Sequence, residues 1–191
     1  MSKTLFLNAD GNPISIVPLS AIPWRDAVKL YILDKVTILE VYENEYIHSQ
    51  KMIIPKPSVV LAKTYYKSSP KIKCTRGVLM FRDDMRCQYC GKEFKAHELT
   101  LDHVYPKSKG GGKNFENIVC ACRPCNTKKA DTHNMKPLKA PYTPSYYEIV
   151  KKRKQHPVVF AHESWNKYLQ WEAPFTIGSV KEHFGVTIGD L

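Results

Sequence analysis

The sequence predicts an α+β fold organised around a strand–loop–strand–helix unit that four cysteines hold together. Two CxxC pairs, Cys87/Cys90 and Cys122/Cys125, bracket this unit. Between them, two short apolar segments flank a loop that contains three consecutive glycines. On both sides, short β-branched segments alternate with segments whose apolar residues recur at helical spacing, which is typical of a mixed fold.

Residues 1–75 are predicted to form a small α+β unit. Apolar residues recur at helical spacing from Trp24 to Ile32, and Ser20 is placed to cap this helix, with Pro23 in its first turn. Pro55 and Pro57 favour irregular backbone before the last strand. The predicted strands, of which the first two would pair as a hairpin, are Thr4–Asn8, Ile14–Val17, Val36–Tyr42 and Ser58–Tyr66.

The two CxxC pairs are predicted to hold a structural zinc ion. Each pair brings two thiolates within reach of one ion, at about 2.3 Å from each sulfur, and two pairs complete a tetrahedron. Gly91 follows the first pair, where the chain must turn tightly. Four protein ligands leave no open position, so the ion would stabilise the fold. The alternative, four buried cysteines without metal, is disfavoured because two correctly spaced pairs seldom arise by chance.

The segment between the cysteine pairs predicts two strands followed by a helix. Leu99 to Val104 has the composition of a strand. The glycines in the basic loop from Lys107 to Lys113 let the chain return into a second strand, Asn114 to Cys120. A helix is expected over Asn126 to Ala130, directly after the second cysteine pair.

Short helices are predicted on both sides of this unit. A helix over Arg76 to Asp84 leads into the first cysteine pair, and the core domain would comprise residues 76–135. Residues 136–191 are predicted as a C-terminal helical extension. Its helices would run from Thr143 to Lys154 and from Glu163 to Trp171.

The charge of the chain indicates an anionic partner. The 29 Lys and Arg residues exceed the 18 Asp and Glu residues, giving a net charge of +11, and nucleic acid is the commonest partner of such a protein. The sequence shows no membrane-spanning run and no secretory signal, so a cytoplasmic protein without a membrane partner is expected. The basic segments Lys63–Lys73 and Lys151–Lys154 are either nucleic-acid contacts or solvated surface.

The motifs LDHV, ENIV and CRPCNTKK, at these offsets, resemble the HNH endonuclease family, whose fold is known as ββα-metal. The resemblance covers residues 86–131 and is to the subgroup with four zinc-binding cysteines. The segments LFLNADGNPISIV and WNKYL are also similar to longer members. The resemblance implies a metal-dependent DNA endonuclease that hydrolyses phosphodiester bonds with one catalytic divalent ion.

The family's roles fall on four positions of this sequence. His103 would be the general base that takes a proton from the attacking water, and Asn117 would hold the loop and orient the His103 ring. Asp102 and Asn126 would be ligands of the catalytic ion. Many members carry histidine where this chain has Asn126, and a carboxylate with an amide oxygen favours Mg²⁺ or Mn²⁺.

Double-stranded DNA is the expected partner, and a homodimer is a further option. The alternative function is that of a zinc-held nucleic-acid-binding module without catalytic activity, in which Asp102 and His103 would be structural. The complete set of catalytic positions favours the nuclease. The residues expected to contact the DNA backbone are Arg123, Lys128, Lys129, Lys107, Lys109 and Lys113.

Overall fold

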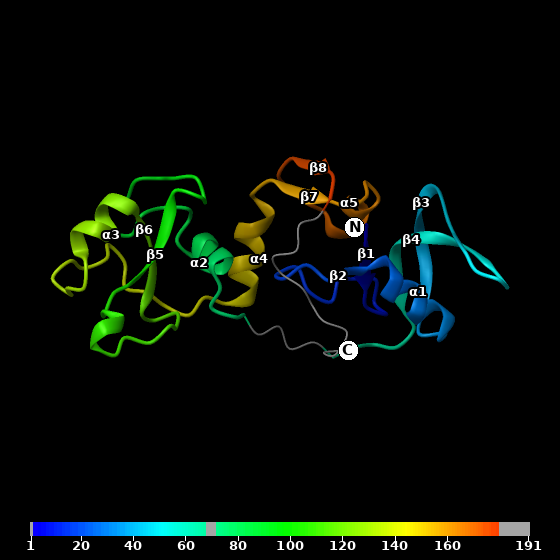
Figure 1. The fold of residues 1–191 in the computed structure, drawn as a ribbon, viewed down its shortest axis with the longest axis horizontal. Coiled ribbons are helices and arrows are strands. Elements are labelled where there is room, and N and C mark those ends of the chain that lie inside the picture. Colours follow the sequence, from blue (N-terminus) through cyan, green and yellow to red (C-terminus); the bar gives the residue numbers. More distant parts are fainter. Residues whose placement is uncertain (1, 68–71, 180–191) are drawn as a thin grey trace. The chain divides into compact units, whose positions relative to one another are not determined.

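The computed structural model describes residues 2–67 and 72–179, and it forms two compact units (Figure 1). The first unit combines the described parts of residues 1–70 and 154–191, and the second comprises residues 71–153. The division into domains at 1–75, 76–135 and 136–191 therefore remains a prediction. Packing joins residues from 154 onward to the N-terminal part of the chain. Among the described residues, no helix is both long enough and apolar enough to span a bilayer.

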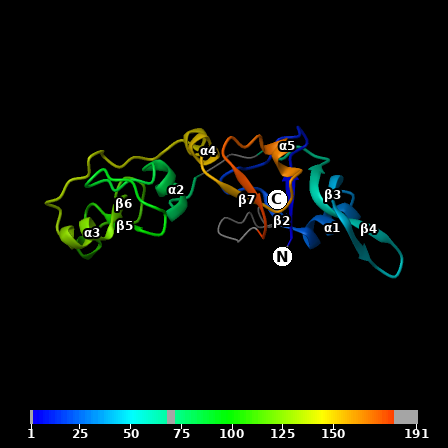
Figure 2. The ribbon, with the colours of Figure 1, turned by 90° about the horizontal axis from the view of Figure 1, so that it is seen from above.

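A four-stranded sheet forms the centre of the first unit. Its strand order is β2-β1-β4-β3, with β1 parallel to β4 and the other neighbours antiparallel. Figure 2 shows that β3 and β4 continue together as a long hairpin. The strands are β1 (Lys3–Leu7), β2 (Ala21–Pro23), β3 (Val36–His48) and β4 (Ile53–Ala62).

Prolines explain two differences from the predicted strands. Ile14–Val17 does not pair along β1, because Pro13 and Pro18 remove backbone donors on either side and only isolated bridges form there. Pro55 and Pro57, by contrast, lie inside β4. They are tolerated because the pairing of β3 with β4 is irregular at these positions, where its register shifts.

The helix of the first unit begins later than predicted. Ser20 does not cap it, because its hydroxyl donates to the carbonyl of Phe6 at 3.0 Å, inside the sheet. The helix, α1 (Trp24–Ile32), starts directly after Pro23, whose fixed φ suits the residue before a first turn. Its buried residues, Ala27 and Val28, face the sheet side of the unit.

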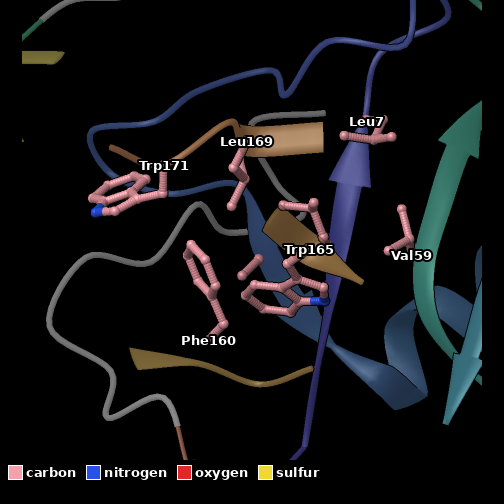
Figure 3. Close-up of a cluster of buried hydrophobic side chains, with 8 residues drawn as sticks. Leu7, Val59, Phe160, Trp165, Leu169 and Trp171 are labelled. Carbon is pink, nitrogen blue, oxygen red and sulfur yellow. The ribbon is translucent and has the colours of Figure 1, made fainter. Parts of the chain in front are cut away.

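The sheet has a hydrophobic cluster on each face. Phe6 packs with Ala27 of α1, whereas the next residue, Leu7, points to the opposite face and packs with Trp165. The second cluster draws aromatic side chains from the C-terminal segment around Leu7 and Val59 (Figure 3). The Trp165 indole N–H also donates to the Ser58 carbonyl at 2.8 Å, so its polar atom is satisfied. The elements of this segment are β7 (Val158–Phe160), α5 (Trp165–Leu169) and β8 (Phe175–Ile177).

The second unit contains the predicted strand–loop–strand–helix, and the α+β fold class is confirmed. The second strand starts only at Ile118, because a turn over residues 114–117 precedes it. The helix that follows starts earlier than predicted, directly after that strand, so the second cysteine pair spans the junction. The elements are α2 (Arg76–Arg82), β5 (Leu99–His103), the short 3-10 helix η1 (Lys107–Lys109), β6 (Ile118–Cys122), α3 (Arg123–Lys129) and α4 (Tyr146–Lys154).

The predicted C-terminal helices are present as α4 and α5, both shorter than expected. The tail beyond residue 179 lies outside the described residues, as does the middle of the basic Lys63–Lys73 segment.

A buried ion pair connects α2 with β6. The Arg82 guanidinium donates to both carboxylate oxygens of Asp83, at 2.8 and 3.0 Å, and also to the carbonyls of Phe115 and Ile118. Asp83 in turn accepts the backbone N–H of Cys120 at 2.8 Å. Because the Arg82 side chain is fully buried, this network fixes the position of β6 relative to α2.

Candidate active site and metal centre

The four predicted cysteine ligands lie together in the second unit. The sulfur atoms of Cys87, Cys90, Cys122 and Cys125 all lie within 4.8 Å of one another. Four sulfurs at about 2.3 Å from a central ion would be about 3.8 Å apart, so the cluster fits a tetrahedral metal site of the zinc type. The cluster can therefore hold a metal ion, and no open coordination position would remain.

Local backbone geometry builds the first half of this cluster. Gly91 has φ +71°, and its N–H donates to the Cys87 carbonyl at 2.8 Å, which closes the turn around the CxxC pair. Burial opposes ionisation of the Cys87 thiol, but backbone N–H groups around its sulfur outweigh it and lower its pKa to about 7. Burial and the neighbouring sulfurs raise the pKa of Cys125 to about 12. A bound cation would favour the thiolate form of all four.

Asp102 is buried beside the cluster and is held from two sides. The hydroxyl of Tyr89, which lies between the first two cysteines, donates to Asp102 Oδ2 at 2.5 Å. The Lys129 ammonium lies 3.1 Å from the same oxygen and also donates to the His103 carbonyl at 2.7 Å. The predicted role of Lys129 as an exposed DNA contact needs correction, because its side chain is only 1% exposed and pairs with Asp102.

Helix α3 packs against β5 (Figure 1), and its side chains contact the face of β5 that carries Asp102. Thr100 and Asp102 are two residues apart in the strand and therefore share a face. The Asn126 Nδ2 donates to Thr100 Oγ1 at 2.9 Å, and one helical turn later Lys129 reaches Asp102. Because the amide nitrogen of Asn126 donates to Thr100, the amide oxygen is the atom of this side chain suited to bind a cation. A carboxylate and an amide oxygen are donors that a hard divalent ion accepts, and in this structure the Lys129 ammonium lies against both oxygens of Asp102.

His103 ends β5, next to a loop that Asn117 holds in place. The Asn117 side chain accepts from the Tyr105 N–H at 2.8 Å and donates to the carbonyls of Tyr105 and Gly112, at 3.1 and 2.9 Å. Gly111 passes so close that a Cβ there would lie 1.9 Å from the Tyr105 carbonyl oxygen. The structure therefore gives Asn117 the loop-holding contacts expected of it. Its predicted effect on the ring of His103 stays a prediction.

The remaining predicted DNA contacts lie on the surface of the second unit. Two lie on α3, and three belong to the glycine-rich loop around η1. All five are exposed: Arg123, Lys128, Lys107, Lys109 and Lys113. A phosphate backbone can reach them without rearrangement of the fold.

Two residues of the site escaped sequence reasoning. Tyr89 and Thr100 make the hydrogen bonds that orient Asp102 and Asn126. The only local signal for Tyr89 is its place inside the first CxxC pair. Thr100 could have been found by the two-residue alternation that puts it on the same face as Asp102.

Comparison with known proteins identifies the class. Residues 87–139 match the family model described as HNH endonuclease. Residues 4–69 match the model described as HNH endonuclease-associated, N-terminal domain. The chain therefore carries an HNH endonuclease domain preceded by the domain associated with it, and the resemblance expected from the sequence is confirmed. An endonuclease of this class is a phosphodiester hydrolase.

The similar proteins found are larger nucleases. The CRISPR-associated endonuclease Cas9 of Corynebacterium diphtheriae is 35% identical over 52 residues, which are 27% of this chain and 5% of that protein. The Cas9 of Actinomyces naeslundii is 38% identical over 47 residues, or 24% of this chain and 4% of that protein. The crystal structure of the type II-C Cas9 of A. naeslundii matches with a TM-score of 0.27 and 18% identity, covering 59% of this chain and 13% of that one. This chain thus spans a small fraction of the length of these relatives.

Proposed function

We propose that this protein is a metal-dependent DNA endonuclease that uses His103 to activate water. The observation that carries the proposal is the meeting of two elements. β5 brings Asp102 to the face that α3 covers, where Asn126 of α3 contacts Thr100, and His103 follows Asp102 at the end of the strand. The cysteine cluster, proposed to bind zinc, fixes this arrangement because α3 begins within the second cysteine pair.

The chemistry expected of these residues is hydrolysis of a phosphodiester. His103 takes the proton from an attacking water, which a neutral imidazole can do near physiological pH. Oxygens of Asp102 and Asn126 would hold Mg²⁺ or Mn²⁺. When bound, such an ion neutralises charge on the scissile phosphate and on the departing 3′ oxygen. Asn117 keeps the loop after His103 closed. The products would be 5′-phosphate and 3′-hydroxyl ends.

The substrate proposed is double-stranded DNA. The exposed cations on the glycine-rich loop and on α3 follow Asp102 and His103 in the chain and alternate with Asn117 and Asn126. Such cations bind phosphates without reading the bases, so weak sequence specificity is expected. The excess of positive charge over the whole chain supports the same partner.

The decisive experiment compares plasmid cleavage by the wild type, His103→Ala and His97→Ala. Supercoiled plasmid is incubated with each protein in EDTA, Mg²⁺, Mn²⁺, Ni²⁺ or Zn²⁺. His97 is an exposed histidine of the same unit, so its variant controls for loss of an imidazole elsewhere. We expect nicking or linearisation by the wild type and His97→Ala with Mg²⁺ or Mn²⁺, and none by His103→Ala or in EDTA.

Two other results would contradict the proposal in different ways. A folded, zinc-loaded wild type that retards DNA in a gel but cleaves with none of these ions would be a nucleic-acid-binding module. Cleavage that persists in His103→Ala would place the general base elsewhere.

A further inference from the structure

The hydroxyl of Tyr89 links the cysteine cluster to the active-site carboxylate. Tyr89 lies between Cys87 and Cys90, and its backbone N–H also points at the Cys87 sulfur at 3.4 Å. Its hydroxyl donates to Asp102 Oδ2 at 2.5 Å. One residue therefore touches a predicted zinc ligand with its main chain and a predicted catalytic-metal ligand with its side chain.

The contacts of Asp102 are unequal between its two oxygens. Tyr89 donates to Oδ2, and the Lys129 ammonium is also nearer to Oδ2, at 3.1 Å, than to Oδ1, at 3.4 Å. The carboxylate is only 8% exposed, so its rotation is limited by these two partners. Together they fix the plane of the carboxylate and leave Oδ1 as the oxygen with the weaker engagement.

We propose that Tyr89 is a positioning residue that orients Asp102 for the catalytic ion. The inference rests on the proposed function, in which Asp102 is a ligand of that ion. The Tyr89 hydroxyl holds Oδ2 of Asp102 and so restricts rotation of the carboxylate. Oδ1 is then the oxygen that would bind the ion. Because Tyr89 lies between two of the cysteines, this hydrogen bond connects the zinc site to the catalytic site, in addition to the connection through α3, which begins within the second cysteine pair. Partners that hold metal ligands commonly change metal affinity ten- to a hundred-fold when removed.

The test uses the full chain with Tyr89→Phe, which removes one oxygen atom and keeps the ring. Binding of Mn²⁺ is measured by electron paramagnetic resonance without DNA, and Asp102→Asn identifies the signal that belongs to the active site. The zinc content and the thermal unfolding midpoint of each protein are measured in parallel. Tyr147→Phe makes the same change on a ring that is 80% exposed and serves as the matched control.

We expect Tyr89→Phe to keep its zinc and to stay folded, with a lower unfolding midpoint because a buried carboxylate loses one donor, and to bind Mn²⁺ about ten-fold or more weakly. The Mn²⁺ concentration for half-maximal cleavage should rise by the same factor, while cleavage at saturating Mn²⁺ recovers. Tyr147→Phe should match the wild type throughout. An unchanged Mn²⁺ affinity in zinc-loaded Tyr89→Phe would overturn the proposal.

Two further outcomes separate this inference from the proposed function. A wild type that binds Mn²⁺ in a Tyr89-dependent manner but does not cleave DNA contradicts the function and leaves the positioning role standing. If Tyr89→Phe fails to retain zinc, Tyr89 is replaced by 4-aminophenylalanine, which keeps a hydrogen-bond donor at this place. Recovery of zinc and of Mn²⁺ affinity together would support the role of the donor, and recovery of zinc alone would refute it.

Discussion

At the scale of single residues, the loop after His103 depends on a close backbone contact. Gly111 is the clearest case, because a Cβ there would meet the Tyr105 carbonyl oxygen at 1.9 Å and the Asn117 amide nitrogen at 2.9 Å. The neighbouring Gly112 has its nearest atom at 3.4 Å, which is an ordinary contact. A side chain therefore fits at Gly112 but not at Gly111.

Gly111→Ala is expected to open the loop after His103, because the methyl group forces Tyr105 and Asn117 apart. The cost should be about 2 kcal/mol of stability, the size typical of overpacking. Plasmid cleavage should fall as well. Thermal unfolding and cleavage rate measure the two effects, with Gly112→Ala as the control in the same loop. Equal behaviour of the two variants would contradict the close contact.

Lys128 and Lys129 provide a second contrast at this scale. Lys129→Met leaves Asp102 buried without its cation, which should cost about 3 kcal/mol in urea denaturation. Lys128 is exposed, so Lys128→Met should leave stability unchanged. It should instead weaken DNA binding and reduce the slope of log K against log salt by about one. The reverse assignment, with the salt slope changed by Lys129→Met, would mean that Lys129 faces the DNA.

At the scale of elements, α2 and β6 depend on the buried Arg82–Asp83 network. Arg82→Met would leave Asp83 and the carbonyls of Phe115 and Ile118 without their donor, at a cost of about 3–5 kcal/mol. The exposed pair of Arg86 with Glu93 offers the comparison, and Arg86→Met should cost less than about 1 kcal/mol. Urea denaturation followed by circular dichroism gives both values. Similar costs would show that the buried network contributes no more than a surface pair.

The elements also show what the sequence could predict. The strand–loop–strand–helix was accessible because its signals are local: cysteine spacing, consecutive glycines and short β-branched segments. The prolines of β4 were misleading, since the irregular register that accommodates Pro55 and Pro57 depends on a partner strand. The burial of Lys129 was equally out of reach, because it depends on Asp102 from a different element. The sequence therefore indicates candidate ligands from local signals, whereas the contacts between elements that surround them come only from the fold.

At the scale of the whole molecule, the two units are stabilised by different means. In the described part of the first unit, the cluster around Phe6 consists of residues from 1–70 alone, and the cluster around Leu7 adds residues from 158 to 175. The second unit is small and has the four sulfurs at the centre of its loops. A small unit of this kind often requires a metal ion to stay folded.

Removal of zinc by a strong chelator under reducing conditions should therefore unfold the second unit and spare the first. Hydrogen exchange followed by mass spectrometry should show loss of protection in β5, β6 and α3, with β1 and β4 still protected. Cleavage should be lost in parallel, and return of zinc should restore both. Loss of protection in both units together would mean that they do not fold independently.

One hydrophobic cluster of the first unit is completed by residues that come late in the chain. Phe160, Trp165 and Trp171 complete the cluster around Leu7 and Val59, whose described members come from residues 5–61 and 158–175 (Figure 3). On a ribosome, the N-terminal strands must consequently wait for these aromatic residues, while the contiguous nuclease unit has all its parts beforehand. Synthesis would thus invert the usual order, in which the N-terminal domain folds first. A chain halted before Trp165 would present a finished nuclease unit beside an incomplete sheet.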